Sequence, residues 1–157
     1  MRFARVPTAF ALILAMAGCA GLPKQPEPLP APQDATSVGQ RFVDAAMALQ
    51  GEPYRYGGDA PGGFDCSGLI AYAAKQTGID VPRTAHEQLH AGVQIERAAM
   101  LPGDLVFMRL KQELHVGIVI SPSKFLHAPS SGGHVRVDQL NARPYREGFI
   151  AARRILP

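Results

Sequence analysis

The chain has 157 residues, of which 46% are hydrophobic and 18% charged, with a formal net charge of +3 at pH 7. No cluster of Lys and Arg with interleaved aromatic residues occurs, so the sequence gives little support to nucleic-acid binding. About 120 residues follow the N-terminal segments described next, which is enough for one domain with its own core and too few for two.

Residues 1–18 have the form of a signal peptide. Arg2 and Arg5 provide a basic start, residues 10–16 form a short apolar run, and small residues lead directly to Cys19. The apolar run is too short to span a membrane. We therefore expect residues 1–18 to be removed, which excludes them from the fold.

The end of this segment resembles a bacterial lipobox, in which cleavage leaves the cysteine as the first residue, acylated on its sulfur and its amine. Met16 stands where Leu is usual. An ordinary signal peptide in which Cys19 is incidental is the alternative. Because Ala20 and not Asp follows Cys19, the resemblance implies a palmitate-bearing anchor in the outer membrane of a Gram-negative cell, with the protein facing the periplasm.

Residues 19–36 combine the acylated cysteine with a linker. Prolines at positions 23, 26, 28, 30 and 32 favour extended polyproline II structure, at about 3.1 Å per residue. We assign the remaining residues, 37–157, to the single domain. With Cys19 lipidated, Cys66 is left alone in an oxidising compartment. The alternative, a Cys19–Cys66 disulfide, would tether a terminal tail to a helix start and leave the histidines described below unexplained.

Two helices of this domain are predicted from helical spacing and capping signals. The first begins at Ser37 with a capping box and ends at Gly51. A shorter helix follows Thr84, has Glu87 at the capping-box offset and stops at Gly92.

Between them lies a helix that carries the most informative residue of the chain. Asp65 is a plausible N-cap for a helix from Cys66 or Ser67 to about Thr77. A helix N-terminus and a nearby imidazole both lower a thiol pKa, so we expect Cys66 to be an activated nucleophile. A small buried hydrophobe is the ordinary alternative for a free cysteine.

After Gly92 the hydrophobic period changes to that of strands. Turns or short polar loops separate five short runs, which predicts an antiparallel meander. Helices first and strands second make an α+β domain with the helices packed on the sheet. The predicted strands are 104–110, 114–121, 124–128, 134–140 and 148–155.

Two histidines fall in these strands. His115 alternates with apolar residues and lies near Gly117, which suggests a close backbone approach. His127 comes one hairpin later, so adjacent strands would let it hydrogen-bond His115 and fix its tautomer. A buried structural histidine is the alternative for each of them.

Six segments, in this order, resemble the NlpC/p60-type cell-wall cysteine endopeptidases; they are residues 53–58, 64–69, 81–84, 102–107, 115–118 and 126–128. The resemblance covers nearly all of the chain after the linker. It implies a papain-like NlpC/p60 fold with N-terminal helices packed on an antiparallel sheet. It also implies hydrolysis of amide bonds in the peptide stems or cross-links of peptidoglycan, next to D-glutamate or diaminopimelate.

The same resemblance assigns roles to residues. Cys66 matches the nucleophile, His115 the base and His127 the third, orienting position. Tyr54 matches a tyrosine whose hydroxyl points into the oxyanion region. Three more residues match motif positions near the cleft, with roles left open: Asp65, Ser67 and Arg83.

Competing hypotheses remain. Residues 86–90 read HExxH, a zinc-peptidase motif, but this helix stops at Gly92, no credible third ligand follows and Glu87 is already a capping residue. A non-catalytic murein-binding lipoprotein and an acyl transferase or amidase on another substrate would use the same fold. We expect a monomer that acts on peptidoglycan peptides, with no metal, no cofactor and no nucleic-acid partner.

Overall fold

A computed structural model describes residues 33–130 and 133–156; the predicted signal peptide, Cys19 and most of the linker lie outside it. In chain order the elements are α1 (Gln33–Met47), β1 (Asp59–Ala60), β2 (Gly63–Phe64), α2 (Cys66–Gln76), α3 (Ala85–His90), β3 (Val93–Ile95), the 3₁₀ helix η1 (Arg97–Ala99), β4 (Leu105–Leu110), β5 (Glu113–Ser121), β6 (Lys124–His127), β7 (Arg136–Gln139), α4 (Arg143–Gly148) and β8 (Phe149–Arg154). Within the described part of the chain, no helix is long and apolar enough to cross a bilayer.

The main sheet has six antiparallel strands in the order β3-β8-β4-β5-β6-β7. Strands β4 to β7 form the predicted meander. The meander prediction is wrong for β8, which does not follow β7 but returns across the sheet to pair with both β3 and β4. Strand β3 was not predicted; its three residues pair with β8 only, so the local pattern is too short to signal it.

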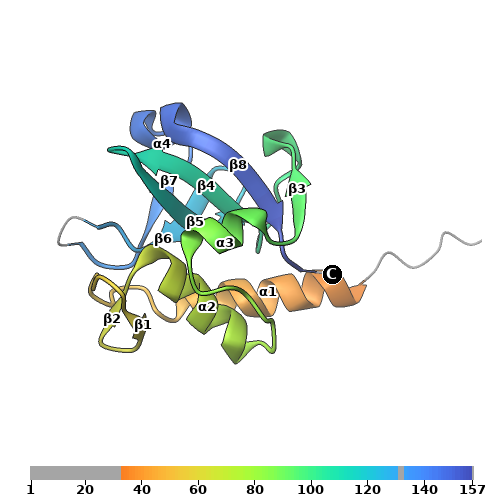
Figure 1. The fold of residues 1–157 in the computed structure, drawn as a ribbon. Coiled ribbons are helices and arrows are strands. Elements are labelled where there is room, and N and C mark those ends of the chain that lie inside the picture. Colours follow the sequence, from red (N-terminus) through yellow and green to blue (C-terminus); the bar gives the residue numbers. More distant parts are fainter. Residues whose placement is uncertain (1–32, 131–132, 157) are drawn as a thin grey trace, which may run out of the picture.

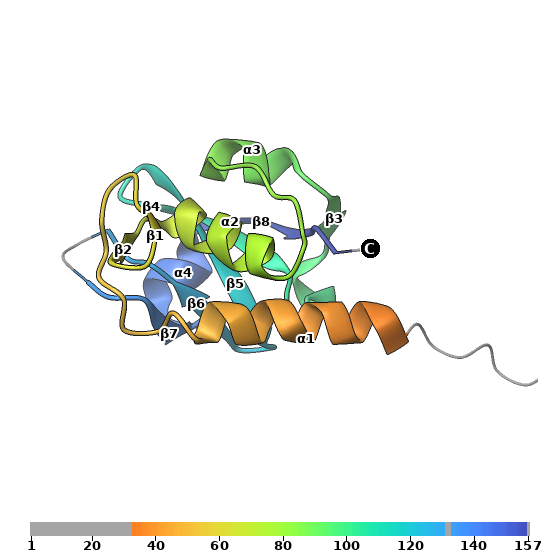
Figure 2. The same ribbon diagram turned by 90° about the horizontal axis from the view of Figure 1, so that it is seen from below.

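Helices α1 and α2 lie side by side along one face of this sheet, with α3 at its margin (Figures 1 and 2). Successive side chains of β4 point to opposite faces of the sheet, so this strand contributes to a hydrophobic core on each face. Leu105 and Phe107 join the cluster beneath the helices, whereas Val106 and Met108 join a second cluster on the opposite face. The α+β class is confirmed, but helix α4 packs near β4 and helps to cover that second face.

The helix termini follow local signals closely where these are strong. Asp65 caps α2, and Thr84 and Glu87 form the predicted capping box of α3. The first helix departs from prediction, since α1 begins at Gln33, inside the segment assigned to the linker, and ends at Met47, before a turn. Its start directly follows the last proline of the run, and proline is tolerated only at the beginning of a helix.

Candidate active site

Cys66 is the first residue of α2, held there by the cap that precedes it. The Asp65 carboxylate accepts a hydrogen bond from the Gly68 backbone N–H at 2.6 Å and one from the Ser67 hydroxyl at 3.1 Å. A side chain at Gly68 would collide with the Gly58 carbonyl, so the turn before the helix lies directly against its first turn. The helix start, and with it the thiol, is therefore fixed by tight local packing.

Arg83, in the segment before α3, hydrogen-bonds to the start of α2 and to the turn that precedes it. Its guanidinium donates to both oxygens of Asp65 at 3.1 and 2.8 Å, to the Ser67 hydroxyl at 3.1 Å and to the Gly58 carbonyl at 3.2 Å. Burial raises the pKa of Asp65, but the hydrogen bonds from Arg83 and from the Gly68 N–H outweigh it and hold that pKa below its usual value. Asp65 is thus both a cap and an ion-pair partner.

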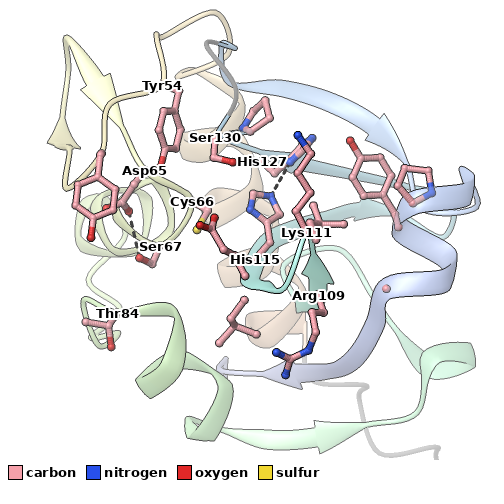
Figure 3. A pocket seen from close by; sticks show the side chains of 18 of the residues that line it. Tyr54, Asp65, Cys66, Ser67, Thr84, Arg109, Lys111, His115, His127 and Ser130 are labelled. Carbon is pink, nitrogen blue, oxygen red and sulfur yellow. Dashed lines mark hydrogen bonds between the residues drawn. The ribbon is translucent and has the colours of Figure 1, made fainter.

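The two histidines meet as predicted. His115 on β5 and His127 on β6 are joined by a hydrogen bond of 2.7 Å between His115 Nε2 and His127 Nδ1 (Figure 3). The predicted close approach at Gly117 is also present, because a Cβ there would lie 2.8 Å from the Leu126 carbonyl oxygen. The absence of a side chain at Gly117 allows the two strands to bring the imidazoles together.

The hydrogen-bond chain continues beyond His127. Its Nε2 lies 3.0 Å from Asp138 Oδ2, and this carboxylate also accepts from the Tyr145 hydroxyl at 2.6 Å and from Arg136 Nε at 3.0 Å. Sequence reasoning missed all three residues. A signal existed for two of them, because residues 136 and 138 share one face of a strand that pairs with β6.

One open cleft gathers the predicted site residues. Cys66 enters it from α2, His115 and His127 from the sheet, and Tyr54 from the segment before β1 (Figure 3). Asp65, Ser67 and Arg83 line the same cleft. The predicted lipidation site, Cys19, lies outside the described residues.

The pKa values of Cys66 and His115 are shifted in directions that differ from the sequence-based expectation. Burial, followed by the negative charge of Asp65, raises the pKa of the Cys66 thiol, and the backbone N–H groups of Val116 and Ser67 offset this only in part. Burial and then the proximity of His127 lower the pKa of His115 to about 3. In the described structure, burial therefore favours a neutral thiol and a neutral imidazole, which is opposite in direction to the lowered thiol pKa expected from the sequence.

The other histidines lie elsewhere. On α3, the His90 ring Nδ1 contacts the His86 carbonyl at 2.8 Å, and the Glu87 carboxylate accepts from the Thr84 backbone and hydroxyl. His134 pairs with Pro53 through its backbone, in an isolated antiparallel β-bridge. Among residues 33–130 and 133–156, no group of three or more His, Cys, Asp or Glu side chains is arranged to hold a metal ion.

Fold and site together define the class of protein. The sequence pattern of the NlpC/P60 family matches residues 51–154, which include the cleft residues from Tyr54 to Tyr145. The chain belongs to the NlpC/P60 family, and the resemblance inferred from its six segments is confirmed.

Two relatives from Escherichia coli (strain K12) show how far the similarity extends. The chain is 37% identical over 131 residues to the murein DD-endopeptidase MepH, covering 79% of this chain and 47% of MepH. It is 36% identical over 146 residues to the probable endopeptidase NlpC, covering 90% of this chain and 94% of NlpC. The chain thus spans about half the length of MepH and nearly all of NlpC.

A solved structure agrees with the fold. The chain superimposes on an NlpC/P60 family protein from Bacillus cereus ATCC 10987 with a TM-score of 0.71 and 30% identity, covering 83% of this chain and 42% of the other. The helices and antiparallel sheet are therefore those of the NlpC/P60 fold.

Proposed function

We propose that the protein is a cysteine endopeptidase that hydrolyses an amide bond in the peptide part of peptidoglycan. One observation carries this proposal: Cys66, at a helix start, shares an open cleft with the hydrogen-bonded pair His115 and His127. A thiol beside an oriented imidazole is the arrangement that nucleophilic acyl transfer needs.

The reaction begins from the neutral pair. As the Cys66 sulfur attacks the substrate carbonyl, its proton passes to His115, which then donates a proton to the leaving amine. Water attacks the resulting thioester with His115 as the base and releases the free thiol. Coupling proton transfer to attack fits a thiol whose pKa is raised by burial.

The developing oxyanion needs hydrogen-bond donors. The Ser67 N–H belongs to the first turn of α2, where backbone donors have no partner within the helix, and the Tyr54 hydroxyl borders the same cleft. We assign these two groups to stabilising the oxyanion.

The substrate class rests on the relatives. MepH is named a murein DD-endopeptidase, and this chain is similar to it over 131 residues. We extend that substrate class to this chain and keep the stem peptides or cross-links, next to D-glutamate or diaminopimelate, as the place of cleavage.

Digestion of purified murein sacculi tests the proposal. Mass spectrometry of the released fragments should show cleavage in the peptides, and Cys66→Ser should release none. Cleavage confined to the glycan strands contradicts the proposal. Binding to sacculi with no cleavage by the reduced wild-type protein would indicate a murein-binding lipoprotein instead.

We also propose that Cys19 anchors the protein to the outer membrane through acyl chains, with the linker as a spacer. The lipobox-like sequence before Cys19 supports this location. Labelled palmitate should enter the wild-type protein and not Cys19→Ser. If both forms fractionate as soluble periplasmic protein, there is no anchor.

A further inference from the structure

His127 faces four polar groups from three elements. His115 approaches it from β5, Arg136 and Asp138 from β7, and Tyr145 from α4. His127 is fully buried, and its Nε2 lies 3.0 Å from the Asp138 carboxylate. Phe125 and Tyr145 pack their rings against the His127 ring, so its orientation is fixed as well as its partners.

Which ring nitrogen of each histidine carries a proton can be worked out along this series of hydrogen bonds, starting from Asp138. A carboxylate only accepts hydrogen bonds, and the other two groups at this carboxylate, Tyr145 and Arg136, donate to it. His127 must therefore carry its proton on Nε2. Because a neutral imidazole has one ring proton, His127 Nδ1 is a bare acceptor.

The consequence passes on to the second ring. His127 Nδ1 lies 2.7 Å from His115 Nε2, so His115 must donate from Nε2 and keep a lone pair on Nδ1. A hydrogen bond between the two histidines alone does not set this order. With both tautomers reversed the same bond forms, but His115 then has its proton on Nδ1 and no lone pair there for the Cys66 proton.

We propose that Asp138 is a positioning residue that fixes the tautomers of His127 and His115 in series, and so gives His115 the form that accepts the Cys66 proton. Tyr145 and Arg136 hold the carboxylate in place. The inference rests on the proposed function in taking His115 as the base. During attack the Cys66 proton moves to His115 Nδ1, the positive charge is shared along the hydrogen bonds, and no proton needs to reach Asp138.

The tautomers can be measured without any substrate. In the full protein labelled with ¹⁵N at histidine, long-range proton–nitrogen correlation at pH 7 should show His115 and His127 protonated at Nε2 alone. Asp138→Ala should give a mixture of tautomers for both rings. Tyr145→Phe removes one of the two donors to the carboxylate but leaves Arg136 and the bond between His127 and Asp138, so it should keep the wild-type pattern.

Kinetics provide a second readout. Asp138→Asn should lower kcat on the order of 100-fold while KM changes about twofold or less, because orientation of the base is lost and the cleft is kept. Both limbs of the pH–kcat profile should move to lower pH, since removing a negative charge lowers the pKa of neighbouring groups. Asp44→Asn, which removes an exposed carboxylate on α1, is the matched control and should change neither quantity.

Three results would overturn the inference. One is a wild-type protein with His127 protonated at Nδ1. Another is an Asp138→Ala variant that retains both tautomers. The third is an Asp138→Asn variant that loses activity with an unshifted pH profile, which would indicate a structural role. If a variant fails to fold, the tautomers measured in the wild-type protein still test the inference. A failure of murein digestion alone would reject the proposed function and not the tautomer assignment.

Discussion

At the residue scale, burial in the cleft favours the uncharged forms of both Cys66 and His115. Burial raises the pKa of Cys66 and lowers the pKa of His115, so the thiolate and imidazolium pair is disfavoured from both sides. A substrate that expels water and places a carbonyl against the sulfur would couple proton transfer to bond formation. The neutral thiol also has less tendency to react with other electrophiles.

This state predicts the pH dependence of alkylation. The rate of reaction of Cys66 with iodoacetamide should keep rising through and above pH 8.5, the ordinary thiol pKa being about 8.5, because the thiolate forms late. Mass spectrometry of quenched samples measures the rate. A rate that levels off below neutral pH would show that the thiol pKa is lowered, as the sequence alone suggested.

The HExxH helix gives a second residue-level prediction. Its Glu87 is held in the α3 capping box, and its histidines do not line the cleft. EDTA should therefore leave murein digestion unchanged, and the double variant His86→Ala, His90→Ala should retain most activity. Inhibition by EDTA together with indifference to iodoacetamide would move the active site to this helix.

At the element scale, the register of β5 against β6 sets the geometry of the histidine pair. An added methyl at Gly117 would meet the Phe125 ring and the Leu126 carbonyl, and so push β6 away from β5. Gly117→Ala should destabilise the fold by about 1–3 kcal/mol and lower activity roughly tenfold or more, because the base is displaced.

A control separates the two effects of this substitution. Ile120→Val lies on the same strand and removes one methylene group, which costs about 0.5–1.5 kcal/mol without moving the backbone. Chemical denaturation and sacculus digestion of both variants should show destabilisation in each, smaller in Ile120→Val, but loss of activity in Gly117→Ala only. Equal activities would mean that the strand spacing does not position the base.

The elements also show what the sequence can reveal. The starts of α2 and α3 were predictable because their caps lie within three residues of the helix. His115 and His127 were predictable because one hairpin separates them. The place of β8 depends instead on pairing between residues about 50 positions apart, such as Leu105 and Arg153, and no local pattern encodes it.

The same distinction applies to the site. Cys66 and the histidines carry recognisable neighbours, whereas Asp138 and Tyr145 have ordinary surroundings in the sequence. The spacing of residues 136 and 138 predicts only that they share one face of a strand, and their contacts with His127 and Tyr145 form when β7 and α4 come together on the far side of His127. Residues that act through another side chain are therefore the part of a site that sequence patterns reveal least.

At the scale of the whole molecule, the buried site makes stability sensitive to acid. The pKa of His115 is about 3 in the folded protein and about 6.5 in an unfolded chain, so between these values the unfolded state binds the extra proton. Stability should thus fall as pH drops through this window, by about 2 kcal/mol from pH 7.5 to pH 5.

Denaturant unfolding of the wild type and His115→Gln at pH 7.5 and pH 5 measures this effect. The variant lacks the titrating imidazole and should lose less stability on acidification. Asp138, whose pKa is held low by Tyr145, His127 and Arg136 against the effect of burial, loses its contribution only at more acidic pH, below about 4. An equal loss in both proteins would place the acid sensitivity elsewhere.

The return of β8 to the middle of the sheet has a consequence for the order of assembly. Strands β4 to β7 can associate by successive hairpins, but β3 has no neighbour other than β8, and β4 remains an exposed edge until β8 docks. Arg154 at the end of β8 also supplies the ion pair, at 2.8 Å, for the buried Asp104. Closing this long loop is slow compared with hairpin formation. We therefore expect a refolding chain to bring the two histidines together before the sheet that supports them is closed, so that any activity of the site should recover only when β8 has docked.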